Sequence, residues 1–225
     1  MEVSIVLPAY NEALNLQPLL FEINEALGKL GWDYEVIVVN DGSSDGSREL
    51  LDGLAVHDSH LKPIHHERNR GYGGALQSGF AAATKPWIFF MDADRQFDIR
   101  EIALLAEKSD AYDYIAGYRA NRQDHWMRKL NAWLFHLGIA FCFGLWYRDI
   151  DCAFKLIRRE IIERAKLESQ GAFINTELLL RARQYGYRIF QLPVSHYPRT
   201  KGNPTGANPA VILRAIKEII IFRFF

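Results

Sequence analysis

The sequence predicts an α/β fold: one large domain with a mostly parallel central sheet and helices on both faces. In the first 120 residues, short runs of β-branched and aromatic residues alternate with longer segments of helical spacing. The length of 225 residues and the hydrophobic content of 49% suffice for a sizeable core. Turn residues close the apolar runs, and ligands of such sheets bind beyond the carboxyl ends of the strands. The loops that follow the strands are therefore the first candidates for function.

Five strands and four helices are expected in this first part. The expected strands are apolar runs bounded by turn residues: Val3–Leu7, Glu35–Val39, Lys62–His65, Trp87–Met91 and Tyr114–Gly117. The expected helices have apolar residues at helical spacing: Leu14–Leu30, Ser44–Val56, Gly73–Thr84 and Ile99–Lys108. Ser43 or Ser44 is expected to cap the second helix, and Asp45 favours its positive N-terminal end.

The pattern changes after Gly117. A polar and basic segment leads into the aromatic-rich Trp126–Tyr147, which we expect to be helical. Further elements follow in the order Phe154–Ile157 (strand), Asn175–Tyr185 (helix), Arg188–Val194 (strand), His196–Pro209 (loop) and 207–225 (amphipathic helix). Residues 1–206 are thus expected to form one domain, with residues 1–120 and 121–206 as its halves.

Composition excludes several classes of protein. Lys plus Arg and Asp plus Glu each total 27, so the net charge is zero, which argues against a uniformly basic nucleic-acid-binding protein. The charge is nevertheless segregated: residues 1–60 are strongly acidic and residues 181–225 strongly basic, so we expect the C-terminal end to meet anions. Cys142 and Cys152 lack a metal-type spacing and exclude a disulfide scaffold. No signal peptide is expected, because the N-terminus opens directly into MEVSIVLP without a basic leader and cleavage site. No membrane-spanning segment is expected either, because the longest charge-free apolar stretch is shorter than about 20 residues.

Two loops in the acidic part have both a structural and a functional interpretation. The first is Pro8-Ala9-Tyr10-Asn11-Glu12. It is either a simple turn in which Asn11 caps the next helix, or a site where Tyr10 stacks on a base and Glu12 accepts hydrogen bonds. The second loop, Asn40–Gly46, has good turn chemistry, yet Asp41 at the end of a strand is placed to accept a hydrogen bond from a base or ribose.

The third loop, Asn69–Gly74, contains the glycines Gly71, Gly73 and Gly74 before a helix. Close approach of a sugar or phosphate explains these glycines about as well as a tight turn does. A nicotinamide oxidoreductase is disfavoured, because a dinucleotide-binding glycine cluster would follow the first strand rather than the third.

The fourth loop is the most specific, because the apolar run Ile88–Met91 ends in Asp92-Ala93-Asp94-Arg95-Gln96. Two carboxylates two residues apart would repel each other at the end of a buried strand unless a cation lay between them. Mg²⁺ or Mn²⁺ bridging protein oxygens and a diphosphate would resolve this repulsion. An ordinary Asp-rich turn is the alternative.

These four loops, in this order and spacing, resemble the inverting family 2 glycosyltransferases of GT-A fold. The resemblance extends to the polyprenyl-phosphate branch, which includes dolichol-phosphate mannose synthase. Its later parts are Gly117-Tyr118-Arg119, the element Asp149–Lys155 with Ala153 in place of the usual glycine, Asn175-Thr176-Glu177, and Pro193-Val194 followed by Arg199–Gly202. The resemblance covers about Val3 to Gly206.

The resemblance implies roles for particular residues. The nucleotide-sugar half would bind the nucleoside through the first three loops: Pro8, Ala9, Tyr10, Asn11, Glu12, Asn40, Asp41 and Gly71. Asp92, Ala93 and Asp94 would form the DxD-type motif, with Asp94 and Gln96 as metal ligands. Arg119, Arg199 and Lys201 would face the donor diphosphate and acceptor phosphate, with Arg128 as a weaker candidate. The catalytic set is Asp92, Asp94, Arg119, Arg199 and Glu177.

The implied reaction moves a sugar from a GDP- or UDP-linked donor to a polyprenyl phosphate, dolichyl or undecaprenyl. A phosphate oxyanion needs no strong general base; a saccharide hydroxyl, the alternative acceptor, would need Glu177 or Asp149 as a base. Glu177 is also interpretable as a surface residue paired with Arg181. A non-catalytic membrane-associated binding module is the remaining alternative, and the intact Asp92/Asp94 pair argues against it.

A membrane surface is a further expectation. Seven aromatic residues between Trp126 and Tyr147, with Arg122, Arg128 and Lys129 nearby, fit an interfacial helix about as well as a core helix. The C-terminal helix suggests the same location or a protein contact. We expect the protein at the cytoplasmic face of a membrane, either peripheral or anchored by a partner or by a segment not in this chain.

Overall fold

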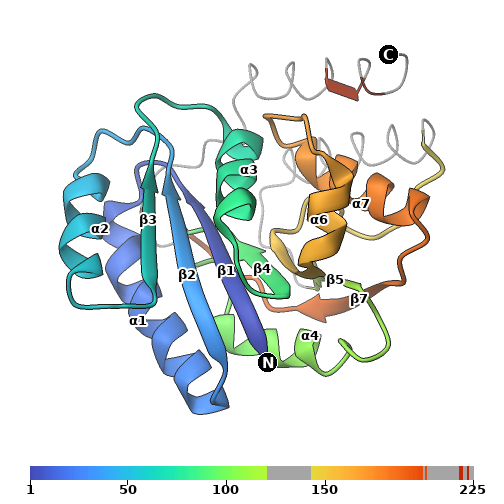
Figure 1. Ribbon diagram of the computed structural model, residues 1–225, viewed down its shortest axis with the longest axis horizontal. Helices are drawn as coiled ribbons and strands as arrows, with labels where there is room; N and C mark the ends of the chain where they lie inside the picture. The colour runs from blue at the N-terminus through green and yellow to red at the C-terminus, as the bar shows by residue number, and fades with distance from the viewer. Residues whose placement is uncertain (121–142, 200, 202–217, 220–221, 223–225) are drawn as a thin grey trace.

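The computed structural model describes residues 1–120, 143–199, 201, 218–219 and 222. Its centre is a seven-stranded sheet of order β3-β2-β1-β4-β6-β5-β7 (Figure 1). The strands are β1 (Glu2–Ala9), β2 (Asp33–Asn40), β3 (Leu61–His65), β4 (Trp87–Met91), β5 (Tyr114–Arg119), β6 (Phe154–Arg158) and β7 (Ile189–Val194). Neighbouring strands are parallel except around β6, which is antiparallel to β4 and β5. The expected mostly parallel sheet is confirmed.

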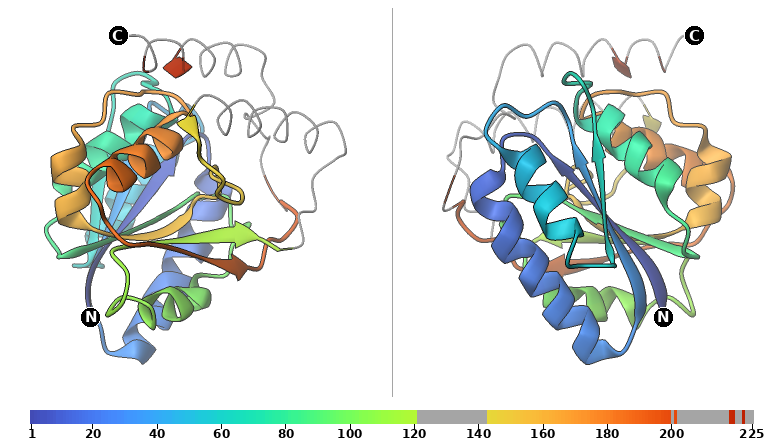
Figure 2. Two further views of the ribbon diagram at one scale, coloured as in Figure 1. Left: turned by 90° about the vertical axis from the view of Figure 1, so that its right-hand side faces the viewer. Right: turned by 60° about the vertical axis from the view of Figure 1, so that its left-hand side comes forward.

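Helices cover both faces of this sheet, as Figure 2 shows. They are α1 (Ala13–Leu30), α2 (Ser47–Ala55), α3 (Tyr72–Ala82), the 3₁₀ turn η1 (Ile99–Glu101) with α4 (Ile102–Ala106), α6 (Arg159–Ala165) and α7 (Ile174–Gln184). Successive side chains of a strand point to opposite faces. Ile5 and Phe89 therefore join the core beneath α1 and α4, whereas Val6 and Phe90 join the core beneath α3, α6 and α7. None of the helices within the described residues is long and apolar enough to cross a membrane.

Several local expectations were wrong. Neither Ser43 nor Ser44 caps α2, because Gly46 in a left-handed conformation holds the N-cap position. The side chain of Asp45 accepts from the backbone N–H of Ser47, the first residue of the helix (3.2 Å). Asn11 is not the cap of α1 either, since Glu12 holds that position. The helix expected over Ile99–Lys108 is shorter and begins as a 3₁₀ turn.

In the second half, α6 was not expected, because it begins directly after β6 without a turn residue. The helix expected to reach Tyr147 does not do so, because residues 144–147 are not helical and Gly144 has a left-handed φ of 63°. The remainder of Trp126–Tyr147 lies outside the described residues, as does most of the expected C-terminal helix. Ile219 and Phe222, which are described, pack against the core beneath α7.

Candidate active site

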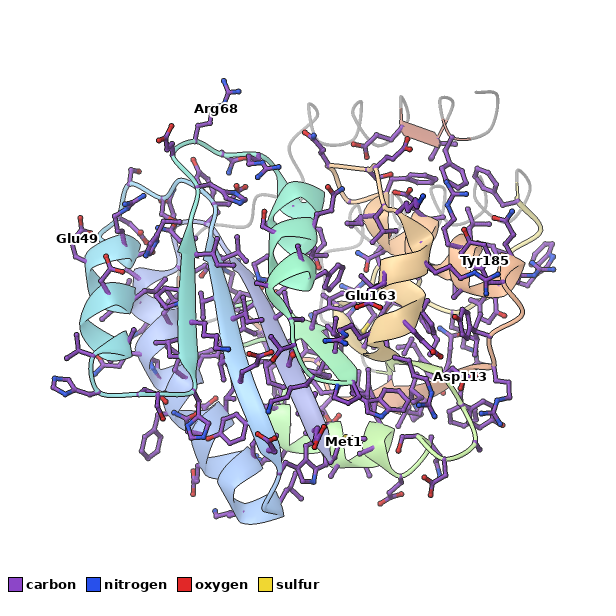
Figure 3. All side chains as sticks on the ribbon, viewed as in Figure 1. Met1, Glu49, Arg68, Asp113, Glu163 and Tyr185 are labelled. Atoms are coloured by element: carbon purple, nitrogen blue, oxygen red, sulfur yellow. The ribbon has the colours of Figure 1, made fainter. Side chains whose placement is uncertain are left out.

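The first two loops form one interlocked unit at the carboxyl edge of the sheet. In Figure 3, Arg68 marks this edge: it lies in the loop after β3, at the opposite end of the molecule from Met1. The backbone N–H of Asn11 donates to Ser43 Oγ (2.9 Å), and Asn11 Oδ1 accepts from the N–H of Ser44 (2.8 Å). These bonds hold Asn11 at a left-handed φ of 56°. Tyr10 remains 41% exposed, which leaves its ring available for stacking.

Asp41 is buried, and three groups of the protein contact its carboxylate. Its Oδ1 accepts from the N–H of Arg70 (2.8 Å), and its Oδ2 accepts from the N–H of Gly71 (2.9 Å). Oδ1 also lies 2.6 Å from Nδ1 of His66, whose Nε2 is 2.8 Å from Ser78 Oγ. Asp41 thus ties β2 to the third loop.

Asn40, at the end of β2, has a similar structural task. Its side-chain oxygen accepts from the N–H of Ser43 (3.1 Å), and its amide nitrogen contacts His65 Nδ1 at 3.1 Å. The second loop is therefore fixed by both residues of its Asn-Asp pair.

Asp92 and Asp94 follow β4, as expected. Asp94 is buried, and its Oδ1 accepts from the N–H of Gln96 (3.1 Å). Burial, together with the negative charge of Asp94, raises the pKa of Asp92 above its usual range. The buried hydroxyl of Tyr72 lies beside Asp92, and burial together with the negative charge of Asp92 raises the pKa of this tyrosine.

This arrangement suits a hard divalent cation. Two neighbouring carboxylates destabilise each other's charge, and oxygen ligands are those that Mg²⁺ and Mn²⁺ prefer. The side-chain nitrogen of Gln96 donates to the carbonyl of Tyr197 (2.9 Å), which leaves its oxygen for a ligand. Within the described part of the chain, no cluster of three His, Cys, Asp or Glu side chains is suited to a metal. A cation here would therefore share Asp94 and Gln96 with oxygens from a bound diphosphate and water.

The late basic loop reaches the same place. Arg199 donates a hydrogen bond from Nη2 to Glu12, and its Nη1 lies 3.5 Å from Asp94 Oδ2. Its Nε donates to the carbonyl of Lys201 (2.8 Å), which closes a short turn. Tyr197 pairs with Gln96 through its backbone N–H (2.8 Å). Lys201, which ends this turn, is exposed.

Arg119 lies at the end of β5 and is held by Asp149. Three of its groups donate to that carboxylate: the backbone N–H (3.0 Å), Nε (2.7 Å) and Nη2 (2.6 Å). Both side chains are largely buried. Arg128 lies outside the described residues, so its expected role is a sequence-based prediction only.

The comparisons with known proteins agree with this geometry. Residues 4–165 match the family model described as Glycosyl transferase family 2. The chain belongs to this family.

Among the relatives of this family 2 chain is the undecaprenyl-phosphate 4-deoxy-4-formamido-L-arabinose transferase of Aeromonas hydrophila subsp. hydrophila. It is 36% identical over 202 residues, which cover 89% of this chain but only 61% of the relative. Glucosyl-3-phosphoglycerate synthase from Mycobacterium tuberculosis has a similar structure, with a TM-score of 0.76 at 18% identity over 99% of this chain and 80% of that one. A complex of that synthase with Mn²⁺, UDP and phosphoglyceric acid gives the same TM-score over 78% of its chain. The expected fold is confirmed.

Glu177 of this family 2 chain is not the surface residue that one interpretation predicted, and its catalytic role stays a prediction. It is fully buried, and its carboxylate accepts from the backbone N–H groups of Glu168 (3.1 Å) and Ser169 (2.9 Å). The expected surface pair with Arg181 was wrong. The observed bonds hold the loop before α7, whose Gln170 carbonyl accepts from the N–H of Gly73 (2.8 Å).

The glycine-rich loop has a structural explanation in this contact. A Cβ on Gly73 would lie 2.3 Å from the carbonyl oxygen of Ser169, and Gly71 has a φ of 90°. Two buried residues of the site had no expected role, His66 and Lys155. The signal for Lys155 was present, because a lysine interrupts the otherwise apolar run Phe154–Ile157.

Proposed function

We propose that this family 2 glycosyltransferase moves a sugar from a nucleoside diphosphate donor to a polyprenyl phosphate, with Mg²⁺ or Mn²⁺ bound at Asp94 and Gln96. The observation that carries the proposal is the convergence of Glu12, Asp94 and Arg199 at one edge of the sheet. The two carboxylates are suited to the donor and its cation, and the guanidinium of Arg199 beside them is suited to phosphate. The undecaprenyl-phosphate transferase relative supports the acceptor, and the UDP complexes of the structural neighbour support a uridine donor.

The reaction follows from the positions of these residues. A bound cation would neutralise charge on the departing nucleoside diphosphate. Tyr10 offers its exposed ring to the base, Arg119 stabilises the charge that develops on the departing diphosphate, and Arg199 binds the acceptor phosphate. The acceptor phosphate oxygen forms a bond to the anomeric carbon as the carbon–oxygen bond to the diphosphate breaks on the opposite face, which inverts that carbon.

The observed contacts favour a phosphate acceptor over a saccharide hydroxyl. A hydroxyl would have to give its proton to a carboxylate, and the two expected bases are engaged elsewhere. The carboxylate of Glu177 accepts hydrogen bonds from N–H groups of the loop before α7, and that of Asp149 accepts hydrogen bonds from Arg119. A phosphate oxyanion is already deprotonated near neutral pH and needs neither of them.

We also propose that the protein works at the cytoplasmic face of a membrane, because its acceptor is a lipid. This chain spans only about 61% of the length of the Aeromonas relative. The aromatic segment Trp126–Tyr147, with basic residues beside it, supports this location.

A donor panel tests the function. UDP- and GDP-linked hexoses and pentoses would each be incubated with Mn²⁺, with and without undecaprenyl phosphate in detergent micelles, and the released nucleoside diphosphate measured. We expect at least one donor whose turnover depends on both the lipid and the cation. Turnover that ignores undecaprenyl phosphate for every donor, or that persists in EDTA, would contradict the proposal.

A further inference from the structure

A lysine is buried in the middle of the sheet, directly beneath the site. Lys155 on β6 is 1% exposed. Its Nζ donates to the carbonyl of Cys152 (2.5 Å) and to the side-chain oxygen of Asn175 (2.7 Å), and it lies 5.1 Å from the ring centre of Phe90. No step of the proposed reaction uses this group.

The charge of Lys155 calls for a reason, because packing alone does not require it. Burial lowers the pKa of Lys155 to about 8, although the carboxylates of Asp92, Asp149 and Asp151 favour its charged form. A methionine would fill a similar volume without the cost of desolvating an ammonium group. The two hydrogen bonds that Nζ donates are therefore the feature to explain.

Those bonds join three parts of the site. Lys155 pairs across the sheet with Phe90, two residues before Asp92, and with Ala116, three residues before Arg119. The Cys152 carbonyl belongs to the turn that also contains Asp149, the partner of Arg119. Asn175 lies in the first turn of α7. One ammonium group thus connects the strand ends of the donor side with a helix from the second half of the chain.

We propose that Lys155 is a positioning residue that fixes the first turn of α7 against the strand ends carrying Asp92 and Arg119, and so aligns the acceptor with the donor. This rests on the proposed function in one respect, the assignment of α7 to the acceptor side. Because Lys155 is almost fully buried, we assign it no direct contact with either substrate. Its loss should leave the donor bound but the acceptor misaligned, and a displacement of about 1 Å can lower a rate by about 100-fold.

The test compares Lys155→Met, Asn175→Ala and the double variant with the wild type. Thermal unfolding first establishes that each is folded. We expect the single variants to bind UDP with a dissociation constant within about twofold of the wild type. Transfer to undecaprenyl phosphate should fall by about 10- to 100-fold relative to donor hydrolysis. The double variant should be no worse than the more impaired single variant, because both changes break the same link. Lys29→Met, a matched change at a side chain that is 72% exposed, should behave as the wild type.

Amide hydrogen exchange gives a second readout that needs no turnover. Lys155→Met should accelerate exchange in residues 174–178 of α7 while residues 87–91 of β4 stay protected. Unchanged exchange in α7, an unchanged ratio of transfer to hydrolysis, or additive effects of the two substitutions would each overturn the positioning role. If Lys155→Met does not fold, Asn175→Ala alone decides the exchange experiment. A wild-type enzyme that binds UDP but ignores undecaprenyl phosphate would overturn the proposed function, and the exchange result would still stand.

Discussion

The guanidinium of Arg199 donates to the carboxylate of Glu12 across 187 positions of the sequence. The same guanidinium lies 3.5 Å from Asp94. The arginine that the sequence placed with the acceptor phosphate is thus in contact with residues expected to bind the nucleoside and the cation. Residues predicted to bind the donor, its cation and the acceptor phosphate therefore meet at a single point of the site.

Replacing Arg199 with alanine should impair transfer more than donor hydrolysis. The substitution removes charge-assisted hydrogen bonds, and the loss of one such bond corresponds to about 10- to 100-fold in rate. The measurement is the ratio of glycolipid formed to nucleoside diphosphate released. Arg48→Ala, at an exposed position of α2, is the control and should leave the ratio unchanged. Equal losses of transfer and hydrolysis would contradict an acceptor role for Arg199.

Asp94→Asn should weaken the binding of Mn²⁺ and lower turnover on the order of 100-fold. The neutral amide keeps the shape of the side chain but removes the charge that attracts the cation. Calorimetric titration of Mn²⁺ in the presence of UDP measures the binding directly. Asp110→Asn, at an exposed position, should bind Mn²⁺ as the wild type does. Undiminished Mn²⁺ binding by Asp94→Asn would remove Asp94 from the metal site.

Glu35 should make the stability of the fold depend on pH. Burial opposes its ionisation, but hydrogen bonds from Lys62, Ser4 and Thr84 outweigh burial and lower its pKa to about 2 from an ordinary value of 4.5. A carboxylate with a lowered pKa stabilises the fold at any pH above its unfolded pKa. This contribution, about 3 kcal/mol, is lost as the pH falls from 4.5 to 2.

Urea unfolding of Glu35→Gln and the wild type measures this contribution. The difference in the free energy of unfolding should be largest near pH 7 and should shrink below pH 4.5. Glu25→Gln, at an exposed ion pair with Lys29, is the matched control and should change little at either pH. A difference for Glu35→Gln that is independent of pH would show that the carboxylate is not held in its ionised form.

Two glycine substitutions should have opposite effects. Gly73→Ala places a Cβ 2.3 Å from the carbonyl oxygen of Ser169 and should destabilise the fold by about 1–3 kcal/mol. Gly28→Ala, in α1 with nothing within 4 Å of the added carbon, should stabilise it by about 0.5–1 kcal/mol. Thermal unfolding of both variants decides the point. If Gly73→Ala left the thermal stability unchanged, the loop before α7 would have to move away from α3 at little energetic cost.

The strands and the positions of the loops were predictable because their signals are local. The run Trp87–Met91 is apolar throughout and is followed directly by Asp92, so both the strand and the site at its end can be recognised in a few consecutive residues. Asn11 shows the limit of such signals. Its cap-like sequence position was misleading because a second loop, supplied by Ser43 and Ser44, takes up its hydrogen bonds.

By itself the sequence determined the α/β class, the order of the strands along the chain and the DxD-type motif, because apolar period and turn chemistry act between neighbouring residues. Only the tertiary structure decided which charged groups meet. Arg199 with Glu12, Lys155 with Asn175, and Glu177 with the N–H groups before α7 are such pairs. The physical reason is burial. A charged group inside the packed sheet and helices is stable only with a hydrogen-bonding partner, and the packing decides which partner is near. No local sequence pattern specifies that partner.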